Sequence, residues 1–251
     1  MSVISIDTNE YEIDGILFDK DGTIIDFMLW IHWAEEFIEL IGDQVDFSFD
    51  KDMLSQFLGY SHDSSWDPKG PLAISSEQDI LTILSLGLYQ QSIPWNQAYQ
   101  IVNDAHQILE ETFRFKQYIK PVNGLIHLLN QAKDHAIKMA VVTSDNYDKA
   151  RKHLDALGIR EYFSAIVGHD LVQRGKPYPE MVYLACEKMG VHPGKTIIFG
   201  DSNGDMTLGK NSGVLAGIGI IPSPTSQNEH LKNADHIISD YCNINLDESI
   251  S

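Results

Sequence analysis

Two aspartates directly behind a short apolar run are the residues of this sequence best suited to chemistry. Residues 16–18 (Ile-Leu-Phe) predict a buried strand that stops at charge and glycine, so Asp19 and Asp21 stand at a strand tip. Side chains alternate along a strand, which predicts Asp19 and Asp21 on one side and Lys20 pointing away from them. Such a carboxylate pair forms half of a Mg²⁺ site, and an aspartate beside a hard cation can attack phosphorus directly.

Other interpretations of this stretch need residues that are not present. In an EF-hand register the first ligand position would be Leu17 and the twelfth Met28, and neither offers an oxygen. A hairpin turn would need a second strand directly after Gly22. A helical pattern follows soon afterwards instead, which leaves the phosphorus chemistry open.

The composition limits the classes of function. The chain has 251 residues, 43% of them hydrophobic, and a formal net charge of −18. This charge argues against nucleic acid or an anionic membrane as a partner, and a phosphate site would have to reverse the field locally with a metal and a lysine. Cys186 and Cys242 have no zinc or redox spacing, and each is expected to be a small buried residue. No signal peptide or membrane span is predicted, so we expect a cytoplasmic protein.

The pattern of the chain changes near Pro121. Residues 27–117 are expected to be all helix and loop, with an irregular stretch over 43–74 and helices over 29–41, over 76–86 and from Pro94 onward. Afterwards strands alternate with helices, which predicts a parallel sheet. The expected strands are 137–142, 165–167, 196–199, 214–217 and 236–238, and the expected helices are 123–134, 147–157, 178–189 and 205–212. Residues 222–226 are expected to form a surface loop, and the acidic tail after Leu246 is expected to be frayed.

Polar groups follow further strands of this predicted sheet, and parallel sheets hold ligands at that edge. Thr143, Ser144 and Asp145 end one strand and can hold phosphate oxygens together with the next helix N-terminus, although this motif taken alone favours Ser144 or Asp145 as a simple N-cap. Lys176, set between Gly175 and Pro177, can offer a point charge to a phosphoryl group, although most lysines are solvated surface charges.

A second pair of acids ends a later strand. Asp201 can complete an oxygen-only Mg²⁺ shell with Asp19, while Asp205 can bind through water or steady Lys176. An EF-hand register that starts at Asp201 fails. The segment 204–211 resembles a P-loop, but it has Asn211 where the metal-binding hydroxyl belongs.

Taken together, these motifs resemble those of the haloacid dehalogenase-like hydrolase superfamily, in its capped branch of phosphoglycolate phosphatase-like and β-phosphoglucomutase-like proteins. The resemblance implies an α/β fold, a Rossmann-like doubly wound parallel sheet as catalytic core (1–26 and 118–251) with an inserted small α-helical cap domain (27–117). The motifs that carry it are Asp19-Lys20-Asp21-Gly22-Thr23, Val141-Val142-Thr143, Lys176 in Gly-Lys-Pro-Tyr-Pro-Glu, and Gly200-Asp201-Ser202-Asn203-Gly204-Asp205.

The resemblance also implies roles for these residues. Asp19 would be the nucleophile, and the Asp21 side chain would protonate the leaving oxygen and later activate water. Mg²⁺ would be held by Asp19, Asp201 and the Asp21 backbone carbonyl, with support from Asp205. The phosphoryl group would be bound by Thr143 and Lys176, and Gly22, Ser144 and Asp145 are further predicted phosphate-binding residues.

Three functions fit this implied chemistry. The first is a phosphatase acting on a small phosphorylated metabolite through an aspartyl-phosphate, as a monomer or homodimer. A sugar phosphomutase would share every core residue and would need a bisphosphate activator. A signalling receiver domain uses similar groups, but it carries an acid pair on its first strand and the acceptor aspartate on a later one. None of the ten histidines is assigned to catalysis.

Overall fold

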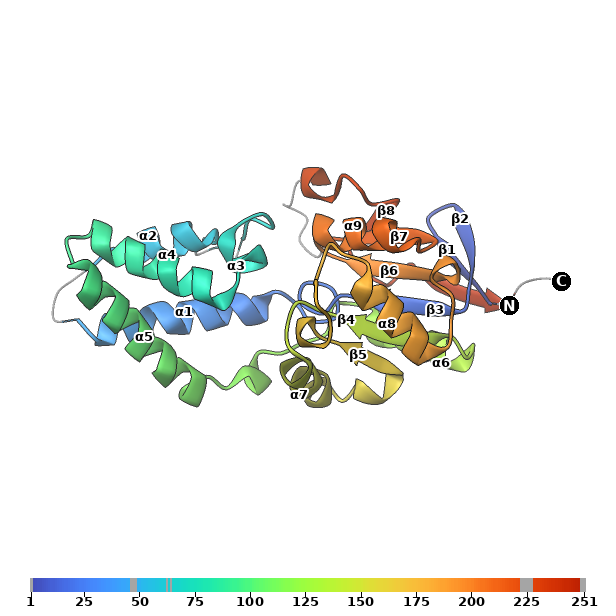
Figure 1. Ribbon diagram of the computed structural model, residues 1–251, viewed down its shortest axis with the longest axis horizontal. Helices are drawn as coiled ribbons and strands as arrows, with labels where there is room; N and C mark the ends of the chain where they lie inside the picture. The colour runs from blue at the N-terminus through green and yellow to red at the C-terminus, as the bar shows by residue number, and fades with distance from the viewer. Residues whose placement is uncertain (1, 46–48, 62, 64, 222–227, 249–251) are drawn as a thin grey trace. The chain divides into compact units, whose positions relative to one another are not determined.

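The chain divides into two compact units in the computed structural model, which describes residues 2–45, 49–61, 63, 65–221 and 228–248 (Figure 1). The core unit comprises Met1–Asp26 and Ile119–Ser251, and the insert unit comprises Phe27–Tyr118. Among the described residues, no helix is both long and apolar enough to cross a membrane.

A six-stranded parallel sheet with flanking helices forms the centre of the core unit, in the order β5-β4-β3-β6-β7-β8 (Figure 1). This confirms the predicted α/β fold class. The expected strand over 214–217 begins two residues later than predicted and continues to Ile220. The strands are β3 (Gly15–Phe18), β4 (Lys138–Val142), β5 (Ala165–Val167), β6 (Thr196–Gly200), β7 (Ala216–Ile220) and β8 (His236–Ile238), and the helices are α6 (Leu125–Asp134), α7 (Tyr147–Leu157), α8 (Glu180–Met189) and α9 (Asn203–Ser212).

The two faces of this sheet are filled by different kinds of side chain. Leu17 and Ile198 point to the face covered by α8 and α9, where they are fully buried. Phe18 and Phe199 alternate to the other face and stack with their ring centroids 5.4 Å apart. Tyr241 packs edge-on against both rings and is itself fully buried. This packing anchors the last residues of β3 and β6, which directly precede the predicted acids.

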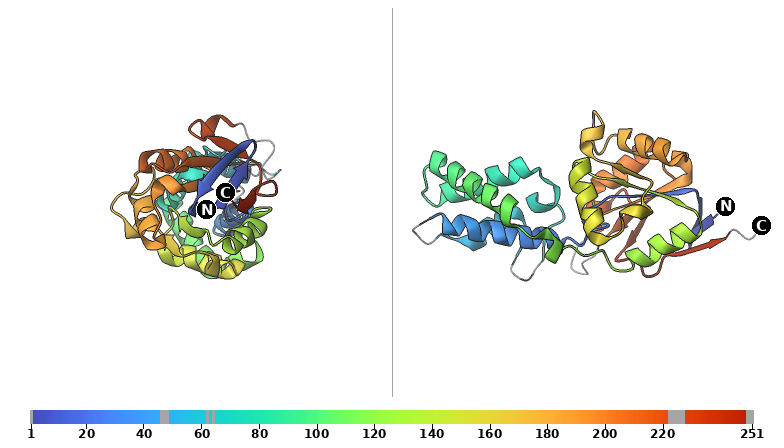
Figure 2. Two further views of the ribbon diagram at one scale, coloured as in Figure 1. Left: turned by 90° about the vertical axis from the view of Figure 1, so that its right-hand side faces the viewer. Right: turned by 90° about the horizontal axis from the view of Figure 1, so that it is seen from below.

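A second, antiparallel sheet joins the two ends of the described chain. It consists of β1 (Ser2–Ile6) between β2 (Asn9–Ile13) and β9 (Asn245–Glu248), and Figure 2 shows these strands side by side. The expectation of a frayed tail after Leu246 is therefore wrong for residues 247–248, because β9 pairs with β1 and buries Leu246. The loop expected over 222–226 lies outside the described residues.

In its described residues the insert unit has helices and no strands, and it has its own apolar core. The expected irregular stretch over 43–74 is wrong in part, because its described residues include two helices. The longer of them has an Asp50 side chain that accepts from the Met53 N–H and ends at Gly59 in the left-handed conformation. The helices are α1 (Met28–Asp43), α2 (Lys51–Leu58), α3 (Pro71–Ile74), α4 (Glu77–Gln90) and α5 (Trp95–Thr112), and the 3₁₀ helices of the chain are Phe115–Gln117, Arg160–Tyr162, His169–Leu171, Pro193–Lys195 and Asn228–Leu231.

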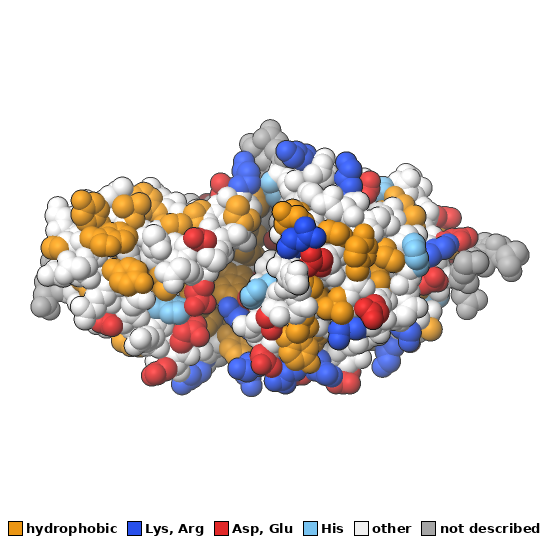
Figure 3. All heavy atoms as spheres, viewed as in Figure 1, with side chains coloured by type: hydrophobic (Ala, Val, Ile, Leu, Met, Phe, Trp, Pro, Cys, Tyr) orange, Lys and Arg blue, Asp and Glu red, His pale blue; other side chains and the backbone are white. Residues whose placement is uncertain are grey.

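Some apolar side chains of the insert unit remain at its surface. Orange patches mark this unit in the space-filling view (Figure 3), and Tyr89, Trp95 and Tyr99 are each more than two-fifths exposed. Their neighbouring ring centroids lie 6.3 and 6.4 Å apart, so these aromatic rings pack against one another.

Candidate active site

Three aspartates and a lysine meet at the carboxyl edge of the parallel sheet. One carboxylate oxygen each from Asp19, Asp201 and Asp205 lies within 4.8 Å of the others. Lys176, whose side chain is only 9% exposed, forms ion pairs with Asp19 and Asp205. We refer to these four residues as the Lys176 cluster. It brings together the lysine and three of the four acids that the sequence predicted for one site, the fourth being Asp21.

The strand order explains why two of these acids meet. Strands β3 and β6 are neighbours, with Phe18 opposite Phe199, and the Asp19 N–H donates to the Phe199 carbonyl at 2.9 Å. The chain places β4 and β5 on one side of β3 and β6 to β8 on the other, so the pair lies at the switch point of the sheet.

Gly22 provides the space for Asp201. Its φ of +73° lies in the left-handed region, and a Cβ at this position would stand 2.1 Å from the Asp201 Oδ2. The Gly22 N–H donates to the Ile25 carbonyl at 2.8 Å, which closes the turn after Asp21. In this structure Gly22 therefore shapes the acid cluster, and its predicted contact with phosphate stays a prediction.

Asp205 is fixed by the start of helix α9. Ser202 and Asp205 form a capping box, in which the Ser202 hydroxyl accepts from the Asp205 N–H and the Asp205 Oδ2 accepts from the Ser202 N–H at 3.1 Å. The other Asp205 oxygen faces Lys176. The segment 204–211 that resembles a P-loop lies within α9, so it is helix and not a phosphate-binding loop.

The electrostatics of the Lys176 cluster favour a bound cation. Burial raises the pKa of Asp19 to about 7, and the nearby carboxylates of Asp205 and Asp21 add to this, although Lys176 opposes it. Burial and the charges of Asp19 and Asp205 also raise the pKa of Asp201 well above its usual value. One lysine does not compensate three carboxylates, of which Asp19 and Asp205 are buried, so the cluster has the charge and the oxygen-only donor set that fit Mg²⁺.

Lys176 remains charged despite its burial. Burial alone would lower the pKa of Lys176, but the carboxylates of Asp19 and Asp205 outweigh it and raise this pKa above its ordinary value. An ammonium that is protonated at every working pH can neutralise a phosphoryl group.

The predicted phosphate-binding residues after β4 have different surroundings. Thr143 is buried, and its hydroxyl accepts from the Asp145 N–H at 3.2 Å. Ser144 is exposed. The cap of α7 is neither Ser144 nor Asp145 but Asn146, whose side chain accepts from the Lys149 N–H.

Lys20 lies where the sequence did not predict it. The expectation that Lys20 points away from Asp21 is wrong, because its Nζ lies 2.6 Å from both Asp21 carboxylate oxygens. The regular strand ends at Phe18, and the Lys20 carbonyl then accepts from the N–H groups of Ile24 and Ile25 at 2.8 and 2.9 Å. The chain turns tightly here, so the alternation of a strand no longer applies.

The Lys20 side chain is completely buried among polar groups. Its Nζ lies 3.0 Å from the Asp145 Oδ2 and 3.1 Å from the His153 Nδ1, in addition to Asp21. We refer to Lys20, Asp21, Asp145 and His153 as the Lys20 cluster. The carboxylate of Asp145, predicted to lie at the phosphate site, is thus paired with lysine.

Sequence reasoning missed His153 and Tyr241. His153 lies on α7 at the spacing of an ordinary buried helix position, and no motif marks it. The Tyr241 hydroxyl donates to the Thr23 carbonyl at 3.1 Å beneath the acids. Cys242 is exposed, so its expected burial is wrong, whereas Cys186 is buried as predicted.

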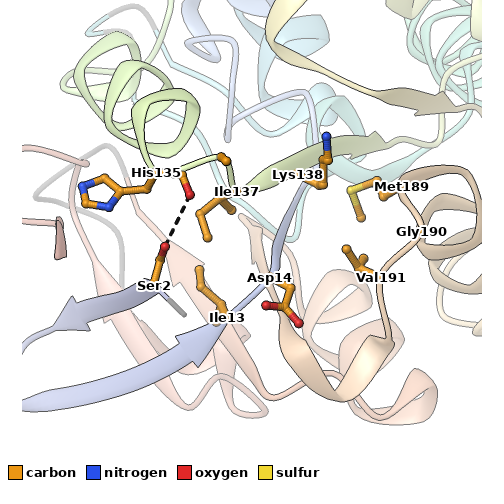
Figure 4. A pocket seen from close by; sticks show the side chains of 10 residues that line it. Ser2, Ile13, Asp14, His135, Ile137, Lys138, Met189, Gly190 and Val191 are labelled. Atoms are coloured by element: carbon orange, nitrogen blue, oxygen red, sulfur yellow. Dashed lines mark hydrogen bonds between the residues drawn. The ribbon is translucent and has the colours of Figure 1, made fainter. Parts of the chain in front are cut away.

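The hollow in Figure 4 lies at the opposite edge of the sheet. It measures about 330 Å³ and is lined by residues at the amino ends of β3 and β4, among them Asp14 and Lys138. The Ser2 hydroxyl donates to the His135 carbonyl across it at 3.4 Å. It contains none of the acids of the Lys176 cluster, so we do not assign the active site to it.

Comparison with known proteins gives the class of this protein. The family model of haloacid dehalogenase-like hydrolases matches residues 13–213, and the chain belongs to this family. It is 26% identical over 212 residues to a phosphoglycolate phosphatase of Shigella dysenteriae, covering 82% of this chain and 81% of that protein. It is 32% identical over 122 residues to a phosphorylated carbohydrates phosphatase of Thermotoga maritima, where the match covers 48% of this chain and 56% of the relative.

Several of the curated relatives are matched over only about half of their length, as the Thermotoga protein is. Among solved structures, a putative β-phosphoglucomutase from Thermotoga maritima superposes with a TM-score of 0.69 at 22% identity, covering 92% of this chain and 97% of that one. This likeness shows the fold.

Proposed function

We propose that the protein is a Mg²⁺-dependent phosphatase that hydrolyses a small phosphate monoester, of the phosphoglycolate or sugar phosphate kind, through an aspartyl-phosphate on Asp19. The observation that carries this proposal is the contact of the Asp19 carboxylate with Lys176 inside a group of three converging carboxylates. Membership of the hydrolase family and the matched phosphatases support it.

The first half of the proposed reaction transfers the phosphoryl group. The Asp19 carboxylate attacks phosphorus, the bond from phosphorus to the ester oxygen breaks, and Asp21 gives its proton to that oxygen. Lys176 and Thr143 hold the phosphoryl oxygens in line for this displacement. Asp19, Asp201 and the Asp21 backbone carbonyl, with support from Asp205, would hold Mg²⁺, which would supply neutralisation of the phosphoryl charge.

The second half restores the enzyme. Asp21, now ionised, takes a proton from water, whose oxygen attacks phosphorus and releases inorganic phosphate and the Asp19 carboxylate. The same residue thus serves as acid and then as base. Replacing Asp21 by alanine is therefore expected to cost on the order of 10²–10⁴-fold in turnover, the usual size of such a contribution.

We also propose that residues 27–117 act as the cap domain, which selects the leaving group and excludes water. The support is their place in the chain, since they interrupt the core unit directly after the segment that carries Asp19 and Asp21.

The test is Mg²⁺-dependent phosphate release from a panel of small phosphate esters by the native chain, Asp19→Asn and Asp14→Asn. Asp14 lies exposed at the other end of β3, so Asp14→Asn is the matched control and should keep native activity. Asp19→Asn should lose on the order of 10⁶-fold, as the loss of a nucleophile does elsewhere.

Native protein that releases no phosphate from any ester would contradict the phosphatase. Conversion of a sugar phosphate into its isomer only when a bisphosphate is added would instead identify a phosphomutase.

A further inference from the structure

Lys20 is the one buried cation at the carboxyl edge that the proposed reaction does not use, among the residues that the structure describes. Its side chain has 0% exposure, whereas the Asp21 carboxylate that it contacts is 28% exposed. A fully buried lysine is rare unless it is paired, so its partners define what it does.

The contact with Asp21 restrains the whole carboxylate. The Lys20 Nζ lies 2.6 Å from Asp21 Oδ1 and 2.6 Å from Asp21 Oδ2. A cation bound to both oxygens restricts the rotation of the group about its last side-chain bond. The remaining exposed part of Asp21 is then presented in one orientation.

Two further residues hold Lys20 itself in place. The Asp145 Oδ2 lies 3.0 Å from Nζ, and the His153 Nδ1 lies 3.1 Å from it. A lysine ammonium only donates, so the His153 Nδ1 must accept and the ring must be neutral. Burial, together with the charge of Lys20, lowers the pKa of His153 to about 4, which agrees with a neutral ring.

The backbone of Lys20 adds to this rigidity. Its carbonyl accepts from the N–H groups of Ile24 and Ile25, which closes the turn that contains Asp21. Main chain and side chain of one residue therefore fix both the position and the orientation of the Asp21 carboxylate.

We propose that Lys20 is a positioning residue for the proton transfers of Asp21, held in turn by Asp145 and His153. This inference rests on the proposed phosphatase function. General acid catalysis matters most when the leaving oxygen is strongly basic, and it matters little for a leaving group that departs without a proton. A misplaced Asp21 should therefore slow esters of simple alcohols and spare activated aryl esters.

The test compares two substrates under single-turnover conditions with enzyme in excess, which isolates the transfer to Asp19. One is the best alkyl phosphate of the panel, and the other is 2,4-dinitrophenyl phosphate. Lys20→Met should slow the alkyl ester on the order of 10²-fold, the cost of a misplaced group, and the aryl ester by less than about 5-fold. Lys138→Met, at the exposed start of β4, is the matched control and should match native rates on both.

A double-mutant cycle gives a second measurement. If Lys20 acts through Asp21, Lys20→Met should cost less than about 3-fold in a chain that already carries Asp21→Asn. Asp145→Asn keeps Lys20 but weakens its ion pair with residue 145. It should slow the alkyl ester by less than Lys20→Met does, and it should also spare the aryl ester. Lys20→Arg keeps the charge and should recover part of the alkyl rate.

The outcomes separate this inference from the function on which it rests. A native chain that turns over neither ester would overturn both. A native chain that is active, with Lys20→Met, Lys20→Arg and Asp145→Asn each slowing both esters equally, would overturn the positioning role alone. Near-UV circular dichroism and melting curves establish that each variant is folded. If Lys20→Met does not fold, the substrate dependence of Lys20→Arg and Asp145→Asn tests the positioning role instead.

Discussion

The Lys176 cluster and the Lys20 cluster stand at the same edge of one sheet, and each has a buried lysine among carboxylates. They differ in their charge balance. Lys176 stands among three carboxylates, and the pKa values of Asp19 and Asp201 are raised. The two carboxylates of the Lys20 cluster have two lysines close by, Lys20 and Lys149. In the Lys20 cluster burial alone would raise the pKa of Asp145, but Lys20 and Lys149 outweigh it and the pKa is lowered. The Lys176 cluster therefore has uncompensated negative charge and is suited to bind a cation. The charges of the Lys20 cluster are paired, so it is suited to hold the Asp21 carboxylate in place.

Among these predictions, removal of divalent metal should have the largest effect, because it acts on the Lys176 cluster and leaves the Lys20 cluster unchanged. Chelation is expected to lower phosphatase activity by about 10³–10⁴-fold, because a catalytic metal contributes several kcal/mol of transition-state stabilisation. Added Mg²⁺ should restore the activity and raise the melting temperature. Asp201→Asn should lose the thermal shift and Asp145→Asn should keep it, as measured by differential scanning calorimetry. An equal shift in both variants would place the metal elsewhere.

Replacement of Lys176 by methionine should come next in size. It removes a donor aimed at the phosphoryl group, and loss of one such donor typically costs on the order of 10²–10³-fold in kcat. Unlike Lys20→Met, this change should slow alkyl and aryl esters alike, because both carry the same phosphoryl group. Steady-state kinetics on the two esters measure the difference, and a loss confined to alkyl esters would show that the two lysines do the same work.

The pH dependence of Mg²⁺ binding should be the third effect. Asp19 must lose its proton to bind metal, and its pKa is about 7 in the metal-free protein. Below this pKa the affinity should fall by at least about tenfold per pH unit, or roughly 10²-fold or more between pH 7 and pH 5, as isothermal titration calorimetry can measure. An affinity that is flat over this range would mean that Asp19 is already ionised there.

The raised pKa of Asp19 also makes the stability of the metal-free protein depend on pH. This dependence is opposite to that of Mg²⁺ affinity, because stability falls as pH rises. Asp19 takes up a proton more readily in the folded chain, at about 7, than at its ordinary value of 3.8. In metal-free protein its contribution to the free energy of unfolding should therefore fall as pH rises from about 4 to about 7. The Asp19→Asn variant should lack this component in pH-dependent melting curves.

The smallest expected effect concerns the support of the Lys20 cluster. Asn146 caps α7, the helix that carries His153, by accepting from the Lys149 N–H at 2.8 Å. Asn146→Ala should lower the free energy of unfolding by about 1 kcal/mol, measured by urea denaturation, because a free N–H remains at the helix start. Exposed Ser144→Ala, two residues away, should change it far less.

The acids of the site and most of the sheet could be predicted because their signals are local. An apolar run that ends in aspartate marks β3 and β6, and parallel strands bring such ends together. Helix α7 and strand β5 have the predicted bounds, since Asn146 and Gly158 delimit the helix and residues 165–167 are an isolated apolar run.

The features that were missed depend on contacts between distant parts of the chain. Strand β1 pairs with β9 across more than 230 residues, and nothing in either strand names its partner. The predicted direction of the Lys20 side chain was wrong because the backbone leaves the strand at Phe18. The turn that follows is fixed by hydrogen bonds from the N–H groups of Ile24 and Ile25, which the residue pattern does not show. Helix α2 did carry signals, in Asp50 and Gly59, but it is short and lies between irregular segments.

Gly22 has a consequence for how variation in this chain can be interpreted. It offers no functional group, yet its missing side chain is the space that the Asp201 carboxylate occupies. Even the single methyl group of alanine would occupy that space and displace the carboxylate of Asp201, a candidate metal ligand. Every acid of the site would nevertheless remain in the sequence. A comparison that scores only the aspartates and the lysine would class such a variant as intact, although the new side chain would disrupt its candidate cation site.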